Sequence, residues 1–172
     1  MSQVILDSAD MRRTLGRMAH EILEVHGGTE DLVVLGILRR GWPIAKRLAF
    51  LMTQIEGSTV PCGKIDPKSY RDDRREEQSQ DESEIPFRLE DKKVILVDEV
   101  IFTGRTIRAA LDAIIHHGRP SLVELAVLID RGHRELPIQP NYCGKVVGTE
   151  KEDHVIVKVH EIDGEDVVVL SR

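Results

Sequence analysis

The segment from Lys93 to Thr106, KVILVDEVIFTGRT, constrains the fold of this chain more than any other. It begins with a continuous apolar run, Val94–Val97, which is typical of a strand buried on both faces of a parallel sheet. Two carboxylates, Asp98 and Glu99, follow at the end of this run, and a helical pattern starts after Gly104. A buried strand that leads through a short loop into a helix is the unit from which parallel α/β sheets are built.

The rest of the chain repeats this alternation. We expect strands at Leu32–Leu38, Thr59–Ile65, Lys93–Val97 and Leu122–Ile129, and helices at Ser8–His26 (with Ser8 as the N-cap), Ile44–Glu56 and Arg105–His117. In the tail, Val155–His160 and Val167–Leu170 flank the turn residues Asp163 and Gly164, which predicts a small antiparallel C-terminal appendage. The predicted fold class is therefore α/β, with a central, mostly parallel sheet and flanking helices, in a single domain spanning residues 1–172.

One stretch carries no core signal. Residues Arg71–Glu84, RDDRREEQSQDESE, are almost wholly polar and charged. Such a composition is typical of an exposed segment, so we expect a flexible loop over about residues 71–86.

Charge and composition limit the function classes. The formal net charge of −6 argues against non-specific binding of nucleic acid, although a local basic patch is compatible with it. Cys62 and Cys143 have no metal-ligand spacing, so we expect buried free thiols in a reducing cytosol. No apolar run approaches the roughly 20 residues of a membrane span, and we therefore expect a cytoplasmic protein that does not bind membranes.

The loop after the Lys93–Val97 strand has the chemistry of a sugar-phosphate site. Ligands of open α/β sheets bind at the carboxyl ends of the strands. Gly104 permits a tight turn, the next helix offers backbone N–H groups to a phosphate, and Thr103 and Thr106 add hydroxyl donors. Asp98 and Glu99 would repel a phosphate, so their better partners are ribose hydroxyls or Mg²⁺. The sequence contains neither GxxxxGK[ST] nor GxGxxG, which weakens nucleoside-triphosphate and dinucleotide sites.

This segment resembles the phosphoribosyl-pyrophosphate (PRPP) signature of type I phosphoribosyltransferases. Other motifs narrow the resemblance, in order along the chain: MRRTLGRMAHEI, RRG at Arg39–Gly41, YRDD at Tyr70–Asp73, GRP at Gly118–Pro120 and DRGHRELP at Asp130–Pro137. Together they resemble the bifunctional pyrimidine operon attenuation regulators that also have uracil phosphoribosyltransferase activity. The resemblance implies the type I phosphoribosyltransferase fold.

The resemblance also implies site residues. It assigns the 5′-phosphate cradle to Phe102, Thr103, Gly104, Arg105 and Thr106, the ribose hydroxyls to Asp98 and Glu99, and the pyrophosphate loop to Arg40 and Gly41. It assigns a lid over PRPP to Tyr70, Arg71 and the charged loop, and the uracil site to Asp130, Arg131 and Gly132. The catalytic set would be Asp98, Glu99, Arg40 and Arg71, with Mg²⁺ entering on PRPP and also within reach of Asp98 and Glu99.

A second activity would need RNA. Arg13, Arg17 and His20 fall on one face of the first predicted helix, and His133, Arg134 and Lys145 could extend that face into a basic patch. Charged residues at helical spacing are usually only a solvated surface. The resemblance nevertheless assigns these positions to binding of the leader mRNA of pyrimidine genes, promoted by UMP or UTP, in a homo-oligomer that is a dimer or larger.

Several residues depart from the pattern of that family. Glu99 replaces an aspartate, Arg39 replaces a threonine, and Pro67, Lys68 and Ser69 replace apolar and threonine residues. On the RNA side, Gly16, Val25 and Gln139 replace a threonine and two arginines, and Gly148-Thr149-Glu150 replaces Pro-Thr-Ser.

Three functions compete on these residues. The first is a uracil phosphoribosyltransferase that forms UMP and diphosphate, and the second is a nucleotide-sensing RNA-binding regulator with little or no catalytic activity. The third is a purine phosphoribosyltransferase. Phe102 counts against it, because related purine enzymes carry an acid at that position.

Overall fold

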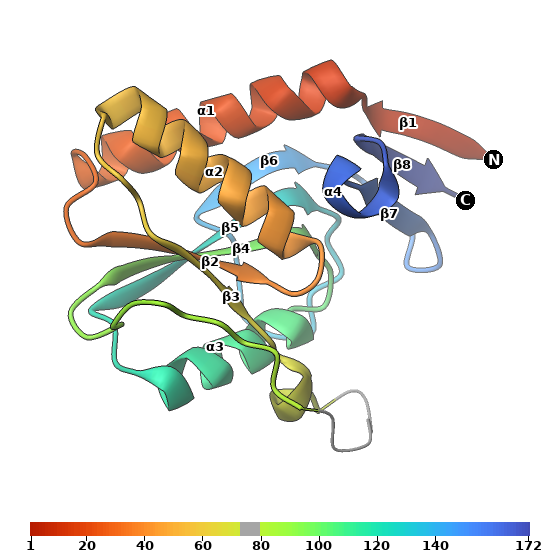
Figure 1. Cartoon of the computed structure of the whole chain (residues 1–172). Coiled ribbons are helices and arrows are strands. Elements are labelled where there is room, and N and C mark those ends of the chain that lie inside the picture. The colour runs from red at the N-terminus through yellow and green to blue at the C-terminus, as the bar shows by residue number, and fades with distance from the viewer. Residues whose placement is uncertain (73–79) are drawn as a thin grey trace.

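The computed structural model describes residues 1–72 and 80–172, and within them the chain forms two sheets (Figure 1). The larger is a five-stranded sheet in the order β3-β2-β4-β5-β6, and all of its neighbouring strands are parallel. Its strands are β2 (Leu32–Ile37), β3 (Cys62–Ile65), β4 (Lys93–Ile101), β5 (Leu122–Asp130) and β6 (Tyr142–Val146). The predicted parallel α/β sheet is confirmed.

Helices cover both faces of this sheet. Helices α1 (Ser8–His26) and α2 (Gly41–Glu56) lie together on one face, and α3 (Arg105–His117) lies on the other (Figure 1). Alternate residues of β2 enter the two cores, with Val34 packing toward α1 and α2 and Leu35 packing toward α3. Every residue of β2 is buried, which explains why this strand is a continuous apolar run.

The smaller sheet is antiparallel and contains three described strands in the order β1-β8-β7. It comprises β1 (Ser2–Leu6), β7 (His154–Lys158) and β8 (Val167–Ser171), with the short helix α4 (His160–Asp163) between β7 and β8. The antiparallel appendage is therefore confirmed, but it also includes the N-terminal strand, which the sequence analysis missed. The two chain ends meet there, since the N-terminal amine of Met1 donates to the carbonyl oxygen of Arg172 at 3.1 Å.

Several predicted boundaries were wrong. The N-cap of α1 is Asp7 and not Ser8, because the Asp7 carboxylate accepts from the backbone N–H of Asp10 at 2.8 Å and the Asp10 carboxylate accepts from that of Asp7 at 3.1 Å. Helix α2 begins at Gly41, since Pro43 is tolerated in a first helical turn, where its missing N–H is not needed.

The strand predictions also need correction. Strand β3 begins at Cys62, three residues later than Thr59 would give, and β4 continues past Val97 to Ile101. Strand β6 and the short 3₁₀ helix at Lys68–Tyr70 were not predicted, because neither has an apolar periodicity.

Two further expectations concern cysteines and membranes. Cys62 and Cys143 are free but only partly buried, and burial raises the pKa of the Cys62 thiol to about 12. Across the described ranges, no helix combines the length and the apolar character that crossing a bilayer would take.

Candidate functional site

The acidic pair lies inside β4 and not in the loop after it. Asp98 is 5% exposed, and its Oδ1 accepts from the backbone N–H of Glu99 at 2.9 Å. Burial raises the pKa of Asp98 well above its usual range, the neighbouring charge of Glu99 raises it further, and Arg71 acts in the opposite direction. Asp98 therefore sits near other charged groups and has little water to stabilise its ionised form.

Gly41 brings the start of α2 against this pair. A Cβ atom at position 41 would lie 2.6 Å from the carbonyl oxygen of Val97 and 3.3 Å from Oδ1 of Asp98. The first distance is too short for any side chain, so glycine is required by the close approach of two backbones. The β2–α2 loop is thereby held beside the acidic pair.

The phosphate-type loop has the predicted form. Gly104 adopts a φ of 92° and is the N-cap of α3, and Thr103 Oγ1 accepts from the backbone N–H of Arg105 at 3.3 Å. Within the described chain, the first turn of α3 has neither an acidic residue nor a side-chain cap. A cavity of about 300 Å³ lies here, lined by Arg71, Ile101, Phe102, Thr103, Gly104 and Thr106, among others. Its backbone donors suit an anion.

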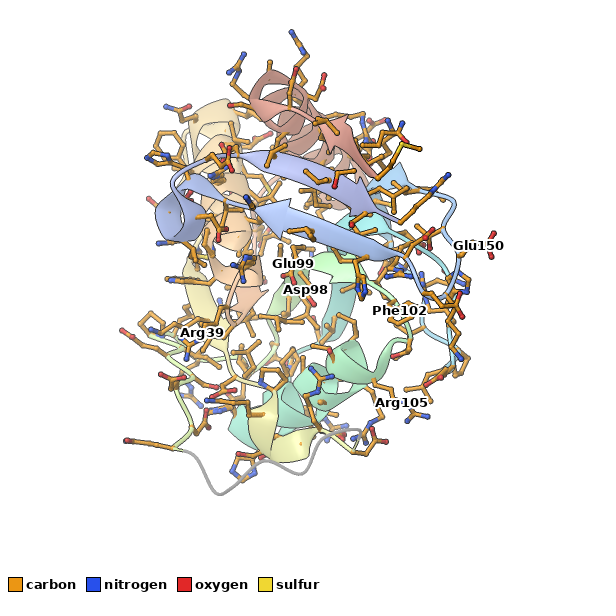
Figure 2. All side chains as sticks on the ribbon, turned by 90° about the vertical axis from the view of Figure 1, so that its right-hand side faces the viewer. Arg39, Asp98, Glu99, Phe102, Arg105 and Glu150 are labelled. Carbon is orange, nitrogen blue, oxygen red and sulfur yellow. The ribbon has the colours of Figure 1, made fainter. Side chains whose placement is uncertain are left out.

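A second cavity, of about 170 Å³, adjoins the first. It is lined by Arg39, Asp66, Lys68, Arg71, Glu82 and Thr106, together with Leu38 and Pro67. Arg71 and Thr106 line both cavities, so we call the two together the cleft. Figure 2 shows Asp98 and Glu99 between Arg39 on one side and Phe102 and Arg105 on the other.

Arg40 is held by α4, the short helix between β7 and β8. Its Nη2 and Nε donate to the two carboxylate oxygens of Asp163 at 2.8 and 3.2 Å, and this pairing raises the pKa of Arg40. The charge of Glu99 acts in the same direction. Arg40 therefore links the β2–α2 loop to α4, and its charge acts on that of Glu99.

Arg105 does not point its guanidinium at the cleft. It pairs with Asp72 at 3.0 Å and with Glu135 at 2.9 Å, while Nη2 of Arg108 donates to the carbonyl oxygen of Tyr70 at 2.6 Å. The backbone at Arg105 remains part of the predicted cradle, whereas its side chain ties together the segments on either side. Sequence reasoning missed Arg108 and Glu135, and no local pattern marks either of them.

The predicted uracil residues end β5. Asp130 accepts from the backbone N–H of Gly132 at 3.0 Å and pairs with Arg134 at 2.7 Å. Arg131 is 7% exposed and lies over the Phe102 ring, with 4.0 Å between the guanidinium carbon and the ring centroid. The Arg131 side chain therefore supports Phe102, which lines the cleft.

Arg131 also fixes the loop before β7. It donates to the carbonyl oxygens of Asp153 and Glu150 at 2.8 and 3.0 Å. The segment before β7 that contains Glu150 is therefore tied to the predicted uracil-binding residue Arg131.

Four of the six predicted RNA residues lie on neighbouring elements. Arg13 and His20 are exposed on α1, and Lys145 is exposed on β6. Arg17 connects these elements, because its guanidinium donates to the carbonyl oxygen of Gly144 at 2.5 Å and to that of Cys143 at 3.3 Å.

The other two RNA residues make contacts within the protein. The Arg134 side chain is 13% exposed and donates to the carbonyl oxygens of Phe102 and Ile138 at 3.0 and 2.8 Å. The ring nitrogen of His133 lies 2.7 Å from the carbonyl oxygen of Thr149. Arg134 is thus engaged in shaping the cleft.

The predicted lid falls in part on residues 73–79, which lie outside the described residues. The end of the loop that is described packs on the β3 edge of the larger sheet. Lys64 and Glu84 form an antiparallel bridge, and the backbone N–H of Glu82 donates to Asp66 at 3.1 Å. A flexible loop over about residues 71–86 remains a prediction.

Comparison with known proteins agrees with this geometry. The phosphoribosyl transferase domain family matches residues 2–163. The bifunctional protein PyrR of Pelotomaculum thermopropionicum is 54% identical over 169 residues, covering 96% of this chain and 93% of that protein. That of Clostridium novyi is 52% identical over 168 residues, covering 96% and 94%. A crystal structure of a hypoxanthine phosphoribosyltransferase from Staphylococcus aureus superposes with a TM-score of 0.74 at 18% identity, covering 98% and 91%, which shows a shared fold.

Proposed function

The chain belongs to the phosphoribosyl transferase domain family and, within it, to the bifunctional PyrR proteins, and from this premise we propose that it transfers a phosphoribosyl group from PRPP to uracil and also regulates pyrimidine genes by binding their leader mRNA. One observation carries the enzymatic half. Figure 2 shows the acidic pair of β4 between Arg39, which lines the second cavity, and Phe102, which lines the cavity at the N-terminus of α3, and this order fits the diphosphate, ribose and 5′-phosphate of PRPP.

The proposed roles follow from charge. Backbone donors at Thr103–Thr106 bind the 5′-phosphate, and Asp98 and Glu99 accept hydrogen bonds from the ribose hydroxyls. The C1′–O bond to diphosphate breaks as a bond from the uracil nitrogen to C1′ forms, and the nitrogen releases its proton. Negative charge accumulates on the leaving diphosphate, where Arg40 and Arg71 stabilise it.

The chemistry of the acidic pair also fits Mg²⁺. Carboxylate oxygens are the donors that this ion prefers, but the described residues contain no group of three acidic, histidine or cysteine side chains that would form a cage. Mg²⁺ with few protein ligands usually arrives on substrate phosphates and keeps several waters. Asp98 and Glu99 would hold it together with PRPP, and when bound it would neutralise charge on the leaving group.

Phe102 favours a pyrimidine acceptor. Its ring lines the cleft and is fixed by the guanidinium of Arg131 on one side and by the His133 ring, whose centroid is 5.9 Å away. A fixed apolar ring offers a stacking surface and no carboxylate for a purine ring nitrogen. Asp130 and Gly132, on the loop after β5, are the proposed contacts to the uracil edge.

The regulatory half rests on the surface where α1 meets β6. Arg13, Arg17, His20 and Lys145 place three cations and a ring on neighbouring elements. Because the whole chain is acidic, attraction to RNA would have to come from this patch, so the binding should be selective.

An assay of diphosphate release with wild type and Asp98→Asn tests the proposed enzymatic activity. Diphosphate release is measured with uracil, cytosine, hypoxanthine and orotate as acceptors at saturating Mg²⁺. We expect activity with uracil alone and a loss of about tenfold or more in the variant, which is ~1.4 kcal/mol or more of transition-state stabilisation. Asp31→Asn, in an exposed turn before β2, is the matched control and should keep full activity. Equal activity of the two variants would exclude the role assigned to Asp98.

A gel shift tests the regulator. Wild type should bind a leader hairpin of pyrimidine genes more tightly with UMP present, and a scrambled hairpin should bind weakly. Arg17→Ala should weaken the specific complex without changing uracil transfer. RNA binding in a protein that releases no diphosphate would favour the alternative, a nucleotide-sensing regulator without catalysis.

A further inference from the structure

Two cations that line the second cavity of the cleft share one carboxylate. Nη2 of Arg39 donates to Oε2 of Glu82 at 2.9 Å, and Nζ of Lys68 donates to the same oxygen at 3.2 Å. Lys68 also lies 3.6 Å from the buried carboxylate of Asp66. The hydrogen bond from Lys68 is the largest cause of a lowered pKa of Glu82, and the charge of Arg39 lowers this pKa further, so Glu82 is an anion at neutral pH.

Glu82 is placed there by its backbone. Its N–H donates to Asp66 at 3.1 Å, and the backbone N–H of Asp66 donates to the Ser83 hydroxyl at 2.8 Å. Two residues further on, Glu84 bridges to Lys64 and points its 73% exposed side chain to that residue instead. The position of the Glu82 carboxylate between two cations is therefore set by the β3 edge.

The position of these ion pairs in the cleft matters more for function than their small contribution to stability. Exposed ion pairs stabilise a fold only slightly, and the Arg39 side chain is 65% exposed. These pairs, however, line a cavity together with Arg71 and Thr106, and both of those residues also line the neighbouring phosphate-type cavity. An anion that spans the cleft from the 5′-phosphate loop would end among Arg39, Lys68 and Glu82.

We propose that Arg39 and Lys68 are further diphosphate-binding residues of the cleft in this protein and that the Glu82 carboxylate pairs with them as an internal competitor until the substrate arrives. The proposal rests on the proposed function for the identity of the substrate.

Replacement of the Glu82 carboxylate by diphosphate is electrostatically favourable. A diphosphate group carries more negative charge than one carboxylate and presents several oxygens, so it can accept from both cations at once. Glu82 would then move to solvent, because it lies on the surface. The competitor lowers the affinity for diphosphate and PRPP, and removing its charge should raise that affinity.

Two charge-neutral variants test the proposal. Glu82→Gln removes the competing charge, and Glu84→Gln removes an equal charge two residues away that faces Lys64. Binding of magnesium diphosphate to the full chain is measured by titration calorimetry, and the KM for PRPP is measured with uracil. We expect Glu82→Gln to tighten diphosphate binding and lower the KM by about three- to tenfold, and Glu84→Gln to change both by less than about twofold.

Removing the cations supplies the converse test. Arg39→Thr and Lys68→Met should each weaken binding of magnesium diphosphate by about fivefold or more, and should do so less when Glu82 is already glutamine. If Glu82→Gln and Glu84→Gln behave alike, the competitor does not exist. If Arg39→Thr and Lys68→Met leave diphosphate binding unchanged, these two residues do not bind diphosphate. Since calorimetric binding of magnesium diphosphate does not need turnover, a protein that fails to transfer to uracil would overturn the proposed function alone.

Discussion

Replacing Gly41 by alanine should damage both stability and activity. The added Cβ would lie 2.6 Å from the carbonyl oxygen of Val97, a distance that real Cβ atoms essentially never show. Restoring an ordinary contact of about 3.4 Å requires α2 and β4 to separate locally by about 0.8 Å. Since the same methyl would lie 3.3 Å from Oδ1 of Asp98, the displacement occurs at the acidic pair itself.

The magnitude follows from that displacement. Overpacking typically costs about 1–3 kcal/mol, and alanine recovers part of this through its better helix propensity. A net loss of about 1–2 kcal/mol corresponds to a fall in Tm of roughly 2–8 °C for a domain of this size. A misplacement near 1 Å can cost about a hundredfold in rate, so we expect kcat/KM for PRPP to fall by about 10- to 100-fold.

Gly16→Ala is the matched control. A Cβ atom at Gly16 in α1 meets no described atom within 4 Å, so the same substitution should raise Tm by about 1–4 °C and leave uracil transfer unchanged. Thermal unfolding followed by circular dichroism and the diphosphate-release assay measure both variants. If Gly41→Ala is as stable and as active as Gly16→Ala, the close approach of α2 to β4 is not a requirement of the site.

Two further predictions concern pH. Burial raises the pKa of Asp98, so the native state retains a proton that the unfolded chain releases. The free energy of unfolding should therefore fall as pH rises from about 4 through the raised pKa. In urea titrations, Asp98→Asn should abolish this fall and should be more stable than wild type at neutral pH. Arg47 on α2 pairs with Glu161 and Asp166 and lowers the pKa of both, so these pairs contribute stability above the unfolded pKa that is lost as pH falls through the lowered values. Arg47→Met should therefore cost about 2–3 kcal/mol at pH 7, allowing for partial exposure, with a difference from wild type that shrinks toward pH 3; a constant difference across this range would contradict the assignment.

The acidic pair and the glycine turn could be predicted because their signals are local. A buried run, two carboxylates and Gly104 lie within one short segment, and the strand-loop-helix unit fixes their relative positions. The error was in the end of the strand. Asp98 still pairs with Val127 of β5 in the sheet. Polar residues at the end of an apolar run do not show where the pairing of the strand stops.

Strands β1 and β6 could not be found in the same way. Ser2 of β1 pairs with Ser171 of β8, so the strand exists only because the other end of the chain is there. Strand β6, YCGKV, carries polar residues and a glycine, and it is placed by its parallel pairing with β5 and by α1 packing over it. Both depend on tertiary contacts that override a weak local preference.

The ion-pair partners of the cations also could not be predicted from the sequence, and they determine the charge of the cleft. Arg40 is paired with Asp163 of α4, and Arg39 and Lys68 with Glu82 near β3. Each of these pairs joins segments that are distant in sequence, so no spacing rule indicates them. They allow an acidic chain to assemble several cations at one place without leaving their charges to repel one another. Under the proposed function, binding of PRPP would exchange carboxylates for phosphate oxygens. We therefore expect the affinity of the cleft for PRPP to depend on the carboxylates as much as on the arginines and the lysine.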